Sequence, residues 1–249
     1  MPIGSDAFVV ERLRALATDV EGVVDAALPF VRAFPREGLA LMQCSVLQRL
    51  TWLYRNVEPR LVISALGARL RAMQLRIVEA AAGRRELPLL AQRIMRLPKS
   101  LGPVGVVDPL EASTVDYTAN ALDAMSLVTW ITPQLVAGFE SSFENCREFG
   151  GLLASTTAME RRWFRDPDDG ALERAQRDKK GVATRDIMTD PSLVMHRRAD
   201  GRPLARQRLQ SRLMRGVGIT QRARLIDDTR DDSTKVLIAA SALEGAALV

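Results

Sequence analysis

The residue types that most often perform catalysis or bind metal ions are scarce in this sequence. Its one histidine, His196, stands beside two arginines, and its two cysteines, Cys44 and Cys146, lie far apart. A zinc site or a histidine-based catalytic triad needs several such side chains together. We therefore expect no catalytic set, no bound metal and no cofactor, and we expect both cysteines to be small buried hydrophobic residues.

Two other segments could in principle bind ions. The acidic run at residues 227–232 has carboxylates that could hold a hard cation, but its position favours a charged turn that caps the last helix. The glycines Gly102 and Gly105 lack the spacing and the lysine of a phosphate-binding loop. Neither segment predicts a functional site.

Arginine provides most of the positive charge, and its distribution is uneven. Residues 161–235 hold 19 Lys or Arg against 12 Asp or Glu, and the span from Arg197 to Arg224 holds nine arginines against one acid, Asp200. Only four residues of the chain are lysine. Because the planar guanidinium binds phosphate in a bidentate way, this distribution indicates an anionic partner.

A first basic cluster lies on the expected third and fourth helices. It comprises Arg69, Arg71, Arg76, Arg84, Arg85, Arg93, Arg96 and Lys99. Helical spacing lets several of these side chains share one face. We predict that anionic lipid or RNA contacts Arg69, Arg76, Arg93, Arg96 and Lys99; the alternative is an ordinary solvated helix surface.

A second basic cluster lies on a short amphipathic helix near the C-terminus, whose apolar side includes Leu204, Leu209 and Leu213. It comprises Arg202, Arg206, Arg208, Arg212 and Arg215, followed by Arg222 and Arg224. So many like charges repel one another unless an anionic surface neutralises them. We predict that Arg206, Arg208, Arg212 and Arg215 also bind anionic lipid or RNA.

Charge alone does not separate these two anionic partners. Phosphodiester backbones and acidic lipids both attract arginine without sequence-specific contacts. Few aromatic residues accompany the arginines, which argues against the base stacking typical of single-strand-binding proteins. The main anionic ligand therefore stays open at this point.

The elements that must position these residues are helices. Proline follows a capping-type residue at Asp108-Pro109, Thr132-Pro133, Asp166-Pro167 and Asp190-Pro191, and apolar residues recur at three- and four-residue steps. These patterns predict an all-α fold. The expected helices are a first one ending near Pro29, then 37–55, 59–82, 86–97, 109–131, 133–164, 170–180, 190–197, 203–215, 218–227 and 233–248. Gly83 is a natural stop for the helix at 59–82, and residues 100–107 are expected to form a loop.

The composition changes from apolar to charged at residues 165–170, which form the best candidate linker. We predict an N-terminal helical domain at 1–165 and a smaller, arginine-rich helical domain at 171–249. The first twenty residues lack the pattern of a secretion signal, and no stretch approaches about 20 uninterrupted apolar residues. We therefore expect a protein that is neither secreted nor integral to a membrane.

The order of features resembles the matrix proteins of the orthomyxoviruses, the influenza-like viruses, over about residues 40–160. The similarity includes Trp52-Leu53, Pro59-Arg60-Leu61 with Ala65-Leu66-Gly67, and the passage from Ile77-Val78 to Gly83. It continues through the segment from Tyr117 to Leu122 and from Phe149-Gly150 into an apolar helix. The family's paired Cys and His element has no counterpart here, because no histidine follows Cys146 until His196.

The resemblance implies a structural protein of the virion, without enzymatic activity or a small-molecule substrate. Such a protein polymerises into a lattice beneath the envelope and bridges anionic membrane lipid to the viral ribonucleoprotein. The N-terminal domain would carry the lipid-facing and self-assembly surfaces, and the C-terminal domain would contact neighbours or RNA. The implied locations are the virion, the host cytoplasm and the inner face of the plasma membrane. The nucleus is an alternative location that the resemblance leaves open.

Two other classes of protein remain. In one, the protein binds nucleic acid directly through the arginines at 197–224, as a nucleocapsid-type protein or a bacterial accessory factor; its affinity would then fall steeply with salt. In the other, it is an enzyme whose site uses Asp, Glu, Arg and Tyr117. The sequence shows no constellation that favours the enzyme.

Overall fold

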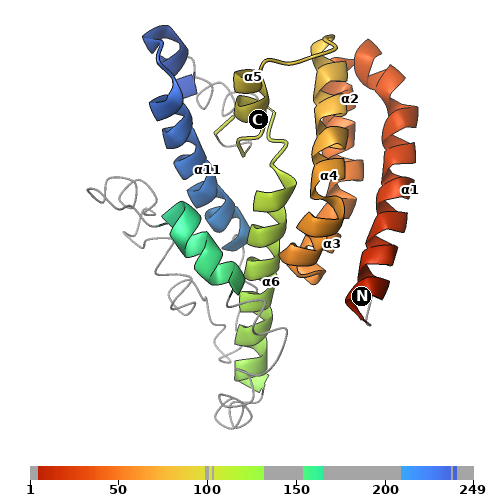
Figure 1. Ribbon diagram of the computed structural model, residues 1–249, viewed down its shortest axis with the longest axis vertical. Helices are drawn as coiled ribbons and strands as arrows, with labels where there is room; N and C mark the ends of the chain where they lie inside the picture. The colour runs from red at the N-terminus through yellow and green to blue at the C-terminus, as the bar shows by residue number, and fades with distance from the viewer. Residues whose placement is uncertain are drawn as a thin grey trace, which may run out of the picture. The chain divides into compact units, whose positions relative to one another are not determined.

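The computed structural model of the protein describes residues 5–98, 101–102, 104–131, 154–164, 209–236 and 238–239. Helices make up the regular structure of these residues, and none of them belongs to a β-strand (Figure 1). The predicted all-α class is thus confirmed. Among the described helices, none is long and apolar enough to cross a membrane.

The chain divides into two compact units. Unit 1 comprises residues 1–113 and 224–249, and unit 2 comprises residues 114–223. The boundary predicted at 165–170 lies outside the described residues, so the division into 1–165 and 171–249 stays a prediction.

Unit 1 begins with α1 (Asp6–Ala33), a 28-residue helix whose first turn is capped by the Ser5 hydroxyl. Its buried residues recur at helical spacing and include Val9, Leu13 and Val24. The helix continues through Pro29, so the predicted end near Pro29 is wrong. Proline keeps a helical φ but cannot donate a hydrogen bond to the Asp25 carbonyl, and the fully buried Val31 in the following turn holds the helix against its neighbours despite that loss.

The next segment forms α2 (Pro35–Leu41), a π-helical turn η1 (Met42–Val46) and α3 (Leu47–Asn56). Close packing of α2 on α1 depends on Gly38, because an added Cβ would lie 2.6 Å from the Cα of Val31. Cys44 lies in η1 and is exposed, so the prediction of a buried cysteine there is wrong. Cys146 lies outside the described residues.

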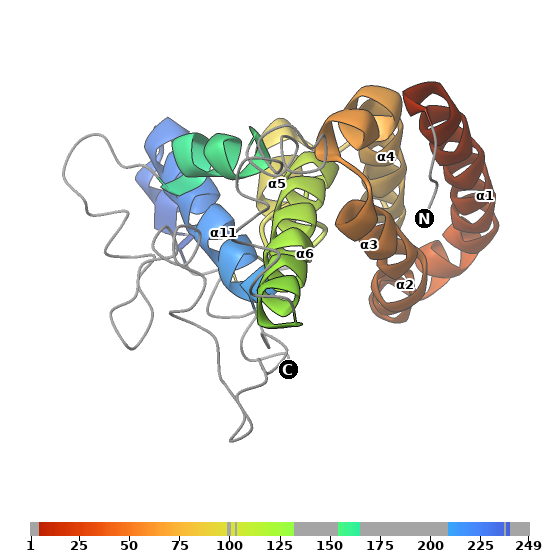
Figure 2. The ribbon, with the colours of Figure 1, turned by 90° about the horizontal axis from the view of Figure 1, so that it is seen from below.

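The long helix α4 (Pro59–Ala82) runs beside α1, and the chain runs in the same direction in both (Figures 1 and 2). Leu66, Leu70 and Ile77 are among the α4 side chains buried against its neighbours. Gly83 ends the helix in the left-handed conformation, with φ of 63°. The predicted helix 59–82 and its glycine stop are therefore confirmed, and the C-terminal ends of α1 and α4 lie at one end of unit 1.

A shorter helix, α5 (Leu89–Met95), follows Pro88 and falls short of the predicted range 86–97. The Val106 amide donates a hydrogen bond of 3.2 Å to the Met95 carbonyl, which fixes the next loop to α5. Helix α6 (Pro109–Ile131) then starts as predicted, with Asp108 as its N-cap. The described part of the predicted loop 100–107 has no regular structure.

Unit 2 has its own core, formed by side chains of α6, of residues 154–164 and of α11 (Leu209–Asp228), a helix that ends in unit 1. Trp163 and Phe164 of the π-helical turn η2 (Glu160–Phe164) are fully buried there. α11 is continuous, so the predicted break between 215 and 218 is wrong. Gly216 serves packing instead, because a Cβ there would lie 2.5 Å from the Phe164 ring.

Candidate anion-binding site

Two of the predicted anion-binding arginines on α4 are paired with acids on α1. Arg69 lies 2.6 Å from a carboxylate oxygen of Glu21 and also donates to the Thr18 hydroxyl at 2.9 Å. Arg76 lies 2.6 Å from a carboxylate oxygen of Asp25. The hydrogen bond from Arg69 lowers the pKa of Glu21, so this carboxylate stays ionised beside its partner.

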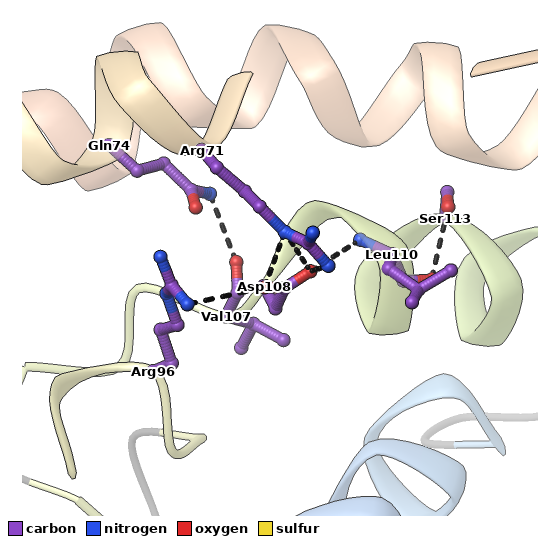
Figure 3. Close-up of polar contacts among 7 residues, drawn as sticks. All are labelled: Arg71, Gln74, Arg96, Val107, Asp108, Leu110 and Ser113. Atoms are coloured by element: carbon purple, nitrogen blue, oxygen red, sulfur yellow. Dashed lines mark hydrogen bonds and ion pairs between the residues drawn. The ribbon is translucent and has the colours of Figure 1, made fainter. Parts of the chain in front are cut away.

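Arg71 and Arg96 meet at one buried carboxylate, Asp108, as Figure 3 shows. Arg71 binds in a bidentate way, with Nε to Oδ2 at 2.8 Å and Nη2 to Oδ1 at 2.9 Å, while Arg96 lies 3.7 Å away. The Leu110 amide donates to the same carboxylate at 2.9 Å, which caps α6. Asp108 thus fastens the start of α6 to α4 and α5.

The pKa of Asp108 reflects these contacts. Burial acts to raise the pKa, since it disfavours the charged carboxylate, but the hydrogen bonds from Arg71 and the Leu110 amide together with the charge of Arg71 outweigh it. The net effect is a lowered pKa. Arg71 and Arg96 therefore have a structural task inside unit 1.

Of the other residues predicted to bind anions, the structure describes only some. Arg93 lies 2.7 Å from a carboxylate oxygen of Asp228, with both side chains well exposed. In unit 2, Arg215 is exposed on α11, whereas Arg212 is partly buried and has a partner within the chain. Lys99, Arg206 and Arg208 lie outside the described residues.

Arg76, together with three arginines outside the predicted binding set, surrounds an open concavity of about 590 Å³ at the C-terminal ends of α1 and α4. We call it the basic concavity. Its lining is Leu28, Arg32, Arg76, Glu79, Ala80, Gly83, Arg84 and Arg85. It brings together side chains from the last turns of both helices and from the turn that follows α4.

Gly83 determines where two of these arginines lie. Its amide donates to the Ala80 carbonyl, and the Arg84 amide donates to the Glu79 carbonyl at 3.1 Å, so the chain turns sharply past the helix end. Arg84 and Arg85 follow that turn and are exposed. The fold of the turn therefore places two consecutive arginines at the rim of the basic concavity.

Positive charge predominates in the basic concavity. Among the described residues, no carboxylate forms an ion pair with Arg32, Arg84 or Arg85, whereas Arg76 is paired with Asp25. The two helix ends contribute partial negative charges equivalent to about half an electron each, and Glu79 adds one full charge. The three guanidinium groups that lack an ion-pair partner among the described residues exceed this total, so the net charge of these groups is positive and favours an anion such as a phosphate group.

The first basic cluster predicted from the sequence includes Arg76, Arg84 and Arg85 but not Arg32. Arg32 lies three residues beyond the predicted helix end near Pro29, in a segment expected to be a loop. The helical spacing between Leu28 and Arg32, four residues apart, could have placed Arg32 on the face of a continued α1, but not beside Arg84 and Arg85.

In the described part of the chain, no three His, Cys, Asp or Glu side chains gather closely enough to hold a metal ion. Comparison with models of protein families, with characterised proteins and with solved structures finds no match to this chain.

Proposed function

We propose that the protein is a viral matrix protein that binds anionic lipid through the basic concavity, polymerises beneath the envelope and bridges the membrane to the viral ribonucleoprotein. The observation that carries the proposal is a group of arginines, Arg32, Arg84 and Arg85, around an open space of about 590 Å³, none of which forms an ion pair with a carboxylate of the described residues. The proposal also draws on the order of sequence features over about residues 40–160, which resembles that of orthomyxovirus matrix proteins.

Individual copies would bind weakly. Each basic residue near an acidic membrane surface contributes about 1 kcal/mol, so three unpaired arginines give about 3 kcal/mol, which corresponds to a millimolar or weaker site. A lattice of many copies converts these weak contacts into stable attachment by avidity. The proposed attachment to the membrane therefore requires polymerisation, because a single copy binds too weakly.

The second anionic partner is assigned to the arginine-rich C-terminal region. Arg206, Arg208, Arg212 and Arg215 belong to the proposed ribonucleoprotein contact, and Arg215 is exposed on α11. The proposal places the protein beneath the envelope of the virion and, in the infected cell, in the cytoplasm and at the inner face of the plasma membrane.

Flotation of the purified protein with liposomes tests the proposal. Liposomes containing phosphatidylserine are compared with neutral ones, with RNA as a competitor, and the vesicles are then imaged by electron microscopy. We expect selective flotation with an ordered protein coat. An absence of flotation, together with tight and salt-sensitive RNA binding, would instead support the nucleic-acid-binding alternative.

A further inference from the structure

Two exposed aromatic rings lie at the junction of α1 and α2. Phe30 and Phe34 are 42% and 54% exposed, and their ring centroids are 5.2 Å apart. The rings pack against each other and so form one continuous apolar surface. We call residues 29–36, which carry this pair, the α1–α2 corner. Burial in the core of unit 1 does not account for side chains with this much exposure.

The α1–α2 corner lies at the same end of α1 as the basic concavity. Arg32, which lines the basic concavity, stands between Phe30 and Phe34 in the sequence. Residues two apart on a helix point to nearly opposite sides, so Arg32 faces the basic concavity while Phe30 points away from it. Arg36 is also exposed at the corner. Only a surface that lies across the helix axis at this end of α1 would reach the rings on one side of the helix and the arginines on the other.

We propose that the α1–α2 corner enters the interface of an anionic bilayer, so that unit 1 attaches to the membrane by the C-terminal ends of α1 and α4. This inference rests on the proposed function and adds the orientation of the protein. Exposed aromatic side chains flanked by arginine suit the bilayer interface, where rings reach the boundary of the acyl chains and guanidinium groups bind lipid phosphates. Charge complementarity with the basic concavity selects an acidic lipid.

The opposite end of α1 provides an internal control. Phe8 is 43% exposed, and Arg12 lies over its ring with 5.8 Å between Cζ and the centroid. Phe8 thus matches Phe30 in exposure and also has an arginine beside it. At 1.5 Å per residue, it lies about 33 Å along the helix axis from Phe30. Attachment by the corner therefore predicts that Phe8 stays out of the bilayer.

The first test compares the full-length variant Phe30→Ala/Phe34→Ala with Phe8→Ala by flotation with phosphatidylserine liposomes. Far-UV circular dichroism and thermal unfolding check that both fold. Loss of the two half-exposed rings lowers vesicle affinity by about tenfold or more, since each transfers substantial apolar area into the interface. The Phe8→Ala variant binds like the unchanged protein.

The second test measures how deeply each end of α1 enters the bilayer, and it leaves Phe30 and Phe34 in place. A nitroxide is attached to a single cysteine at Ala33 or at Glu11, both exposed positions of α1, in a chain with Cys44→Ser and Cys146→Ser. Bound to phosphatidylserine vesicles, the label at 33 becomes accessible to oxygen dissolved in the bilayer. The label at 11 stays accessible to a water-soluble relaxation agent.

The outcomes separate the two proposals. If the unchanged protein does not float, the proposed function and this inference both fail. Flotation that is equally strong in Phe30→Ala/Phe34→Ala and Phe8→Ala, with both labels in water, overturns only the orientation. A third outcome is that Phe30→Ala/Phe34→Ala floats like the unchanged protein but no longer self-associates in solution, in the absence of vesicles. That result would assign the α1–α2 corner to contacts between copies and would also overturn the inference.

Discussion

The middle and the end of α4 both carry arginines, yet their surroundings differ. In the middle, Arg69 is paired with Glu21 and Arg71 binds the buried Asp108. At the end, Arg84 and Arg85 follow Gly83, and no described carboxylate forms an ion pair with either. The first pair of arginines holds neighbouring segments together, whereas the second pair is exposed at the basic concavity.

This difference shows that the number of arginines on a helix is a poor guide to binding. Each acidic partner in the middle of α4 comes from a distant part of the chain, such as α1 or the start of α6. An arginine with a partner has already lost part of its attraction for an external anion, since its charge is locally compensated. The availability of a guanidinium group therefore depends on tertiary contacts.

The largest effect is expected at Asp108. The substitution Asp108→Ala leaves Arg71 without its bidentate partner and removes the cap of α6, which together lower the free energy of unfolding by about 3 kcal/mol. Chemical denaturation measures this loss. The exposed Asp227 provides the control, because Asp227→Ala changes stability by about 0.5 kcal/mol or less. Equal effects of the two substitutions would contradict the structural role of Asp108.

Stability is also expected to depend on pH through the same residue. Because the pKa of Asp108 is lower in the folded protein, its contribution is complete above the unfolded pKa of about 3.9 and is lost as pH falls through the folded value. Denaturation curves between pH 3 and pH 7 should therefore show a loss of stability below about pH 4. This loss should be smaller in Asp108→Asn, and an unchanged acid dependence in that variant would refute the assignment.

Replacing glycine by alanine should change the stability of the protein in opposite directions at the end of α4 and in the interior of α1. Gly83 has a positive φ, so Gly83→Ala destabilises by about 1 kcal/mol and disturbs the position of Arg84 and Arg85. Gly22 lies on α1 with open space around it, so Gly22→Ala stabilises by about 0.5–1 kcal/mol. Thermal unfolding distinguishes the two, and a shift of the same sign in both would contradict this description.

The smallest effect is expected for an exposed ion pair. Arg93 and Asp228 are well exposed, so a double-mutant cycle with Arg93→Ala and Asp228→Ala should give a coupling energy of about 0.5 kcal/mol or less. A much larger coupling energy would show that the Arg93–Asp228 pair stabilises the fold, as the contacts of Asp108 are expected to do.

Much of the fold follows from local sequence rules. Helix α4 and its stop at Gly83 were predicted, as was the start of α6 at Asp108-Pro109, because capping and helix termination depend on a few adjacent residues. The errors at Pro29 and Gly216 have the opposite origin. Both residues usually interrupt helices, but α1 continues past Pro29, and Gly216 accommodates the ring of Phe164 from another segment.

The candidate site was only partly predictable for the same reason. The sequence identified Arg84 and Arg85 as members of a basic cluster, but helical spacing gave no indication that Arg69 and Arg71 have acidic partners elsewhere in the chain. It also could not show that Arg32 joins Arg84 and Arg85, since this depends on the parallel packing of α1 and α4. The pairing of Arg69 and Arg71 and the grouping of Arg32 with Arg84 and Arg85 both depend on contacts between segments that are distant in the sequence.

The most direct measurement of this contrast is the affinity for phosphatidylserine vesicles of two matched double variants, Arg84→Ala/Arg85→Ala and Arg69→Ala/Arg71→Ala, each with its unfolding curve. At about 1 kcal/mol for each unpaired arginine, the first variant should lose about thirtyfold in affinity and keep its stability. The second should lose stability and bind vesicles nearly as well as the unchanged protein under conditions where it is folded. Equal losses of affinity in both would contradict the assignment of binding to the unpaired arginines at the end of α4.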